Sequence, residues 1–102
     1  MNADDWKKIQ EREKILAKLR QALVEKLQVE GPPEELDPDV ALFGSGYGLD
    51  SLDAVELVIF LETEFGLQVS DSDLFDMRGS TRTLNTLADL VMTLKKEPTH
   101  VA

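Results

Sequence analysis

The first hydrophobic positions of the chain recur every three or four residues, with Lys, Arg, Glu and Gln between them. This spacing puts apolar side chains on one face of an α-helix. It predicts an amphipathic helix from about Asp5 to Leu27 or Gln28, ended by the Gly31-Pro32-Pro33 sequence. The apolar positions of this helix are Ile9, Leu16, Leu19, Leu23 and Leu27.

The same periodicity returns between Ser51 and Phe65, but here it forms two rows. One row is assigned to the core and consists of Ala54, Leu57, Val58, Leu61 and Phe65. The second row consists of Leu52, Val55 and Ile59, interleaved with Asp53, Glu56 and Glu62. Two interpretations stay open. Either the core face is wide, or the second row is a docking strip with an apolar centre and an acidic rim, as in protein interfaces.

Further helix signals mark the second half of the chain. Gly66 stands where a C-cap glycine ends a helix. Ser70 is the expected N-cap of a short third helix that Gly79 stops, and Thr83 is a candidate N-cap for the last helix. Pro98 ends that last helix, which has one apolar face. The face consists of Leu84, Leu87, Ala88, Val91 and Leu94.

A long connection with several prolines and glycines, residues 30–50, joins the first two helices. Its apolar residues predict a loop packed on the helices, with one turn of helix near Pro38 to Leu42. No segment has a convincing strand pattern. We therefore predict an all-α fold: a four-helix bundle with three longer helices, a short third helix and a long loop between the first two. The expected organisation is an N-terminal extension or helix start at 1–8, one domain at 9–95 and a flexible tail at 96–102.

The net charge is −9, and the acids are concentrated in the middle of the chain. Between Lys26 and Arg78 there are thirteen acids and no base. Such a surface repels nucleic acid and attracts basic surfaces on other proteins, although acids also simply keep a small domain soluble. No apolar run is long enough to span a membrane, and the charged N-terminus is unlike a signal peptide. Since cysteine is also absent, we expect a cytoplasmic protein. We also expect a monomer.

Several kinds of chemistry are excluded by spacing. The glycines of GSGYG follow no strand and match neither a dinucleotide fingerprint nor a P-loop, so we interpret them as a flexible entry to the second helix. A serine nucleophile needs a base, and the single histidine, His100, lies in the expected tail. The glycine of DSDLFDMRG is misplaced for an EF-hand. We therefore expect no catalytic residue and no specific metal site.

Ser51 has two candidate roles at the start of the second helix. In the structural role, Ser51 or Asp50 is the N-cap, and Asp53 forms a shortened capping box with Asp50. Spacing alone favours this role. In the functional role, the Ser51 hydroxyl is exposed at a loop–helix junction, where a modifying enzyme can reach it. A phosphodiester there would lie at the positive end of the helix dipole, partly opposed by Asp50 and Asp53.

The segment LFGSGYGLDSLDAVELVIFLETEFGLQVSD, residues 42–71, resembles the acyl carrier proteins, in which an Asp-Ser-Leu sequence opens the second helix of a four-helix bundle. The likeness covers roughly Ile9 to Leu94. It implies a stand-alone, type II carrier that is not an enzyme. Ser51 would carry 4′-phosphopantetheine transferred from coenzyme A, with Asp50 and Leu52 completing the motif. The acyl group would be held on this arm as a thioester.

The resemblance also implies partners. A phosphopantetheinyl transferase would attach the arm, and acyl-transferring and condensing enzymes with basic patches would dock on the second helix. The matching docking residues are Asp53, Val55, Glu56, Ile59 and Glu62. The glycine-rich loop is similar to that of specialised carriers of polyketide-like or secondary lipid pathways, rather than those of primary fatty-acid biosynthesis. The alternative is an unmodified acidic helical adaptor that binds a basic protein.

Overall fold

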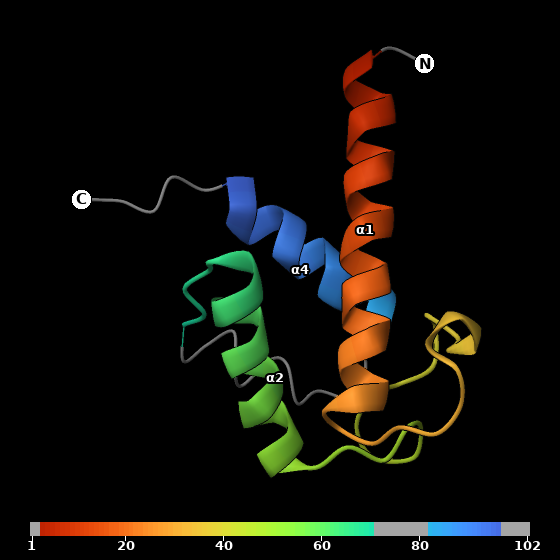
Figure 1. The fold of residues 1–102 in the computed structure, drawn as a ribbon. Helices are drawn as coiled ribbons and strands as arrows, with labels where there is room; N and C mark the ends of the chain where they lie inside the picture. The colour runs from red at the N-terminus through yellow and green to blue at the C-terminus, as the bar shows by residue number, and fades with distance from the viewer. Residues whose placement is uncertain (1–2, 71–81, 97–102) are drawn as a thin grey trace.

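The computed structural model describes residues 3–70 and 82–96 and arranges them as a helical domain (Figure 1). Its elements are α1 (Ala3–Glu25), the 3₁₀ turn η1 (Pro33–Glu35), α2 (Ser51–Phe65) and α4 (Leu84–Lys96). Across these two ranges the backbone forms no β-strand, and one isolated bridge joins Phe43 to Leu49. The all-α class is confirmed. The third helix expected after Ser70 and residues 97–102 of the tail expected at 96–102 lie outside the described residues, and Lys96 is the last residue of α4.

The end of α1 differs from the expected one. The helix ends at Glu25, six residues before Gly31, because Gln28 adopts a left-handed conformation with φ 60°. The Val29 amide then donates to the Leu23 carbonyl, six residues earlier, at 2.9 Å and so satisfies a carbonyl that the end of the helix leaves open. Local backbone geometry at Gln28, rather than the Gly-Pro-Pro sequence, therefore stops α1.

The core lies where α1, α2 and α4 meet. The predicted core row of α2 is confirmed at Ala54, Leu57 and Leu61, which are almost fully buried, whereas Val58 and Phe65 are only partly buried. Burying a leucine side chain contributes about 1.5–3 kcal/mol, so these helices are held mainly by apolar packing. The most deeply buried side chains are Leu19, Leu23, Leu42, Leu57, Leu61, Leu84, Leu87 and Val91.

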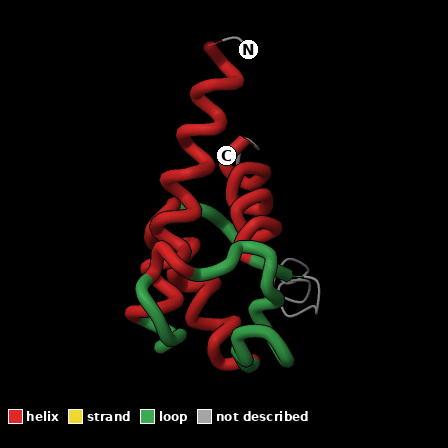
Figure 2. Tube along the Cα trace, turned by 90° about the vertical axis from the view of Figure 1, so that its right-hand side faces the viewer, coloured by secondary structure: helices red, strands yellow, loops and turns green. Residues whose placement is uncertain are grey.

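The N-terminal turns of α1 extend beyond the other elements, as both views show (Figures 1 and 2). Ile9 belongs to the predicted apolar stripe of this helix, yet 41% of its surface is exposed, and Trp6 is 55% exposed. The stripe continues past the point where other helices can cover it. The stripe is buried at Ile15, Leu16, Leu19, Ala22 and Leu23, and Leu27, beyond the end of α1, is only partly buried.

The long loop is packed, as predicted, through Leu36, Leu42 and Phe43. Its one turn of helix lies at Pro33–Glu35 and not at residues 38–42, where it was expected. There the Asp37 carboxylate accepts a hydrogen bond from the Asp39 amide at 2.8 Å. An Asp side chain that bonds its own backbone two residues on competes with helix formation, so this stretch forms a turn instead.

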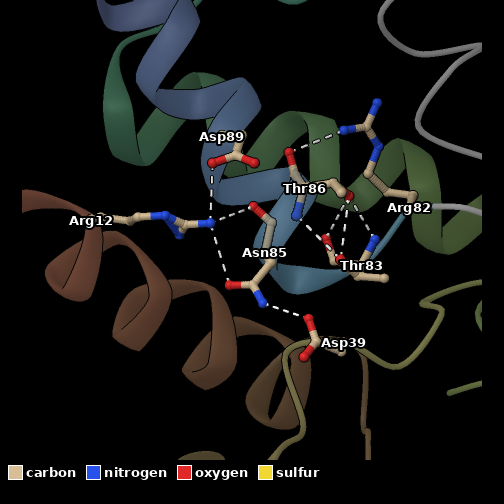
Figure 3. Close-up of polar contacts among 7 residues, drawn as sticks. All are labelled: Arg12, Asp39, Arg82, Thr83, Asn85, Thr86 and Asp89. Atoms are coloured by element: carbon tan, nitrogen blue, oxygen red, sulfur yellow. Dashed lines mark hydrogen bonds and ion pairs between the residues drawn. The ribbon is translucent and has the colours of Figure 1, made fainter. Parts of the chain in front are cut away.

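A cluster of polar contacts joins α1 and α4 to this loop (Figure 3). The Arg12 guanidinium donates to the backbone carbonyl of Asn85 at 3.0 Å and lies 3.1 Å from the Asp89 carboxylate. The Asn85 side-chain amide donates to the Asp39 carboxylate at 2.7 Å. One side chain near the start of α4 thus contacts both the first helix and the loop.

The start of α4 is capped as expected. The Thr86 amide donates to the Thr83 hydroxyl at 3.2 Å, and the Thr83 amide donates to the Thr86 hydroxyl at 2.7 Å. This reciprocal pair satisfies two of the amide groups that a helix N-terminus leaves without acceptors. The N-cap role predicted for Thr83 is therefore confirmed.

Candidate functional site

Ser51 is the first residue of α2, and the residue that caps this helix is its neighbour Asp50. The Asp53 amide donates to the Asp50 carboxylate at 3.0 Å, and the Asp50 amide donates to the Asp53 carboxylate at 2.9 Å. This is the capping box predicted from the spacing of the two acids. Because the cap belongs to Asp50, the exposed Ser51 is not required for it.

The segment before Ser51 forms a hydrogen-bonded turn. At Gly46, an added Cβ would lie 1.8 Å from the backbone oxygen of Ala41, so only glycine fits. The Tyr47 amide donates to the Ala41 carbonyl at 2.9 Å, and the Leu49 amide donates to the Leu42 carbonyl at 3.0 Å. These contacts set the direction in which the chain enters α2.

The hydroxyl of Tyr47 fixes the same turn from the other side. It accepts a hydrogen bond from the Asp37 amide at 2.8 Å and lies 3.2 Å from the Asp37 carbonyl, to which it can donate. The loop is also bonded to the approach to α4, since the Leu42 amide donates to the Arg82 carbonyl at 2.9 Å. The backbone that positions Ser51 is therefore supported by two segments that are far apart in the sequence, the loop at Asp37 and the approach to α4 at Arg82.

The second apolar row of α2 faces solvent, so the interpretation as a wide core face is wrong. Leu52 is 75%, Val55 46% and Ile59 56% exposed. Because three large apolar side chains on one helix remain uncovered, this face has the composition of a contact surface. Together with the neighbouring acids it is called the docking strip. The docking strip consists of Leu52, Asp53, Val55, Glu56, Ile59 and Glu62.

The acids of the docking strip differ in their surroundings. The Asp53 carboxylate belongs to the capping box, and the Glu62 carboxylate accepts a hydrogen bond from the Val69 amide at 3.2 Å. Glu56 is exposed. The ion pair nearest the end of α2 is formed by Glu64 and Lys18, at 2.9 Å. The strip thus combines exposed apolar groups with negative charge along one side of α2.

The surroundings of Ser51 fit a phosphodiester. The first amide groups of a helix lack intrahelical acceptors and point toward such a group, which the helix dipole also favours. The negative charges of Asp50 and Asp53 oppose it, but each carboxylate is directed at a backbone amide by the capping box. Ser51 itself is exposed to solvent. An exposed hydroxyl at a capped helix N-terminus can therefore hold a covalently attached phosphate group.

Comparison with known proteins agrees with this geometry. A family model described as a phosphopantetheine attachment site matches residues 17–91. An acyl carrier protein from Thermotoga maritima is 35% identical over 86 residues, which cover 84% of this chain and 94% of that protein. The fold, the exposed serine and the matched domain define a carrier domain that bears a covalent prosthetic group. More particularly, the chain belongs to the acyl carrier proteins, and its cofactor is 4′-phosphopantetheine.

Members of this family are carriers that serve partner enzymes and are not enzymes themselves. When bound, the cofactor supplies the thiol that holds an acyl group as a thioester, which suits a chain without cysteine. Among the described helices, none is long and apolar enough to cross a membrane. A cluster of three or more side chains able to hold a metal is also absent from residues 3–70 and 82–96.

The sequence did not indicate the residues whose contacts hold the turn before Ser51 or join α1 to α4. Gly46 and Tyr47 belong to a glycine-rich turn in which the only signal for such a role is the tyrosine, whose hydroxyl usually finds a hydrogen-bond partner when it is buried. Arg12 was counted as a polar residue between apolar positions. Its contact with Asn85 joins residues 73 positions apart in the chain, and helix periodicity carries no information on such a pair.

Proposed function

We propose that Ser51 is the attachment residue for 4′-phosphopantetheine and that Asp50 and Leu52 complete the attachment motif. The observation that carries this assignment is that, at the start of α2, one residue caps the helix and the next is exposed. Asp50 caps the helix, and the next residue presents an exposed hydroxyl beside the helix N-terminus. Ser51 lies inside the segment that matches the attachment-site family.

The docking strip is the surface to which partner enzymes bind in this proposal. Its exposed apolar residues Leu52, Val55 and Ile59 would be buried by the partner, while Glu56 and Glu62 would face basic side chains. Apolar contacts contribute most of the affinity at such surfaces, and charges contribute orientation and encounter rate. A phosphopantetheinyl transferase and acyl-transferring or condensing enzymes would use this strip in turn.

The carried acyl groups belong to fatty-acid, lipid or polyketide-like biosynthesis in this proposal. The Asp50, Ser51 and Leu52 sequence and the acidic second helix support an acyl carrier. The glycine-rich turn before them, which resembles that of specialised carriers, supports a specialised role. The protein would act in the cytoplasm as a monomer.

Intact mass spectrometry tests the attachment residue. The apo protein is incubated with coenzyme A and a broad-specificity phosphopantetheinyl transferase, and its mass is followed. We expect the wild type to gain the mass of one phosphopantetheine group and Ser51→Ala to gain none. Ser45→Ala, which removes an exposed hydroxyl from the preceding turn, is the matched control and should be modified as the wild type is.

Two outcomes would contradict the assignment. A wild type that stays unmodified would favour the alternative, an acidic helical adaptor that binds a basic protein. A mass gain that persists in Ser51→Ala would place the arm on another residue. Asp50 provides the N-cap, and a thermal melt of Ser51→Ala shows whether the variant folds, so that loss of modification in a folded variant reports on the hydroxyl.

A further inference from the structure

A hollow of about 520 Å³ lies on the surface of α2 beside the docking strip. It shares Glu56 and Ile59 with the strip and adds residues that sequence reasoning did not single out. Its lining consists of Lys26, Glu56, Ile59, Phe60, Thr63 and Glu64. A partner that covers the docking strip would also cover this hollow.

The aromatic wall of the hollow is held in place from behind. The ring of Phe60 meets that of Phe65 edge to face, with centroids 5.9 Å apart and planes at 89°. The Lys18 ammonium lies 5.7 Å from the centre of the Phe65 ring and pairs with Glu64 at 2.9 Å. Because these contacts restrain the Phe60 ring before binding, filling the hollow costs less conformational entropy than ordering a free side chain would.

Lys26 gives this hollow a charge unlike that of the docking strip. It is the last base before the acidic run that extends to Arg78, and its side chain is exposed. No carboxylate of the described residues lies within 4.0 Å of its ammonium, although Glu56 and Glu64 line the same hollow. The charge therefore remains available to a partner. A base placed opposite it would be repelled, whereas a carboxylate would be attracted.

We propose that this hollow receives an apolar side chain of the partner enzyme, and that Lys26 favours partners that place a carboxylate beside it over partners with a uniformly basic docking surface. The proposal rests on the proposed function, because it assigns specificity to the same side of α2. Glu56 and Lys26 carry opposite charges and line the same hollow. A partner therefore has to present both a basic and an acidic group to match this surface.

The charge part is tested with a transferase whose carrier-binding surface is uniformly basic. Its kcat/KM for loading the apo protein is measured for the wild type and for Lys26→Glu. We expect Lys26→Glu to be loaded about threefold faster at low ionic strength, with the gain shrinking as salt is added. Lys8→Glu, an equal charge change at an exposed residue near the start of α1, is the control. If Lys26→Glu is loaded no faster than this control, selection by Lys26 is wrong.

The shape part is tested by filling the hollow. Thr63→Phe places a ring where the partner's side chain would lie, and we expect kcat/KM for loading to fall about fivefold, with Thr63→Leu giving a smaller loss. Thr93→Phe is the same change at an exposed threonine of α4 and should have no effect. Thermal melts of all three variants show whether they fold. Folded Thr63→Phe that loads as fast as Thr93→Phe would overturn the proposal.

The two levels of inference fail differently. If the wild type is not loaded at Ser51, the proposed function itself is wrong, and the hollow has no partner to select. If the wild type is loaded but Lys26→Glu and Thr63→Phe behave as their controls do, Ser51 keeps its role and only the assignment of the hollow is lost.

Discussion

At the scale of single residues, Gly46 is the tightest constraint near the site. A Cβ at this position would meet the backbone of Ala41 at 1.8 Å, and backbone atoms cannot move aside as a flexible side chain can. We expect Gly46→Ala to lower the free energy of unfolding by about 1–3 kcal/mol, measured by denaturant unfolding. Ser45→Ala, one residue earlier and exposed, should leave the stability unchanged. Equal stability of the two variants would show that the turn is not packed as described.

Gln28 permits a prediction in the opposite direction. Its φ of 60° is strained for a residue with a side chain, whereas glycine adopts it without a steric cost. We expect Gln28→Gly to raise the free energy of unfolding by about 0.5–1 kcal/mol, seen as a higher melting temperature. Gln28→Ala keeps a Cβ and should bring no gain. A Gln28→Gly variant less stable than Gln28→Ala would mean that α1 does not end in this way.

These two residues mark the limit of what the sequence predicts at this scale. The capping box of Asp50 and Asp53 was predictable because it depends on neighbours three residues apart. The contact of Gly46 with Ala41 depends on how the loop folds back on itself. The left-handed conformation of Gln28 was not predictable from residue type, since glycine and asparagine are the usual residues there and Gly31 was the closer match.

At the scale of secondary-structure elements, Arg12 links α1 to α4. It donates to the Asn85 carbonyl and pairs with Asp89 where the two helices meet (Figure 3). We expect Arg12→Met to cost about 1–2 kcal/mol of unfolding free energy, because a partly buried, charge-assisted hydrogen bond is lost. Asp89→Asn removes only a mostly exposed charge and should cost less than about 0.5 kcal/mol. If the two variants lose the same unfolding free energy, the stabilisation comes from the ion pair with Asp89 and not from the hydrogen bond to Asn85.

The helices themselves were largely predictable, because their periodicity is a local property. The bounds of α2 and α4 agree with expectation to within a residue or two at their described ends. Which apolar row of α2 is covered was not decided by periodicity. The exposure of Leu52 and Ile59 depends on where α1 and α4 pack. The exposure of Ile9 depends on how far α1 extends beyond the other helices.

At the scale of the whole molecule, the acidic surface governs encounters with partners. With a net charge of −9, association with a basic enzyme is accelerated by long-range attraction that salt screens. We expect kcat/KM for loading by a basic phosphopantetheinyl transferase to fall about tenfold between low and high ionic strength. Loading reactions are stopped at set times and followed by mass spectrometry at a series of salt concentrations. They measure how kcat/KM depends on ionic strength.

A variant pair locates the effect on the surface. Glu56→Gln removes one charge from the docking strip and should flatten the salt dependence. Glu34→Gln removes one exposed charge from η1 and should flatten it less. If both variants change the slope equally, net charge alone drives association and the docking strip does not orient the partner.

The hydrogen bonds from the long loop to the approach and first turn of α4 bear on attempts to build chimeric carriers. The Leu42 amide donates to the Arg82 carbonyl, and the Asn85 amide donates to the Pro38 carbonyl at 3.1 Å. A transplant that carries the loop together with α2, but not the approach and first turn of α4, would break both native pairings and could leave polar backbone groups unsatisfied. The exchangeable module is therefore discontinuous. It comprises the loop from Leu36, all of α2, and Arg82 with the first turn of α4, and recombination boundaries belong outside these pieces.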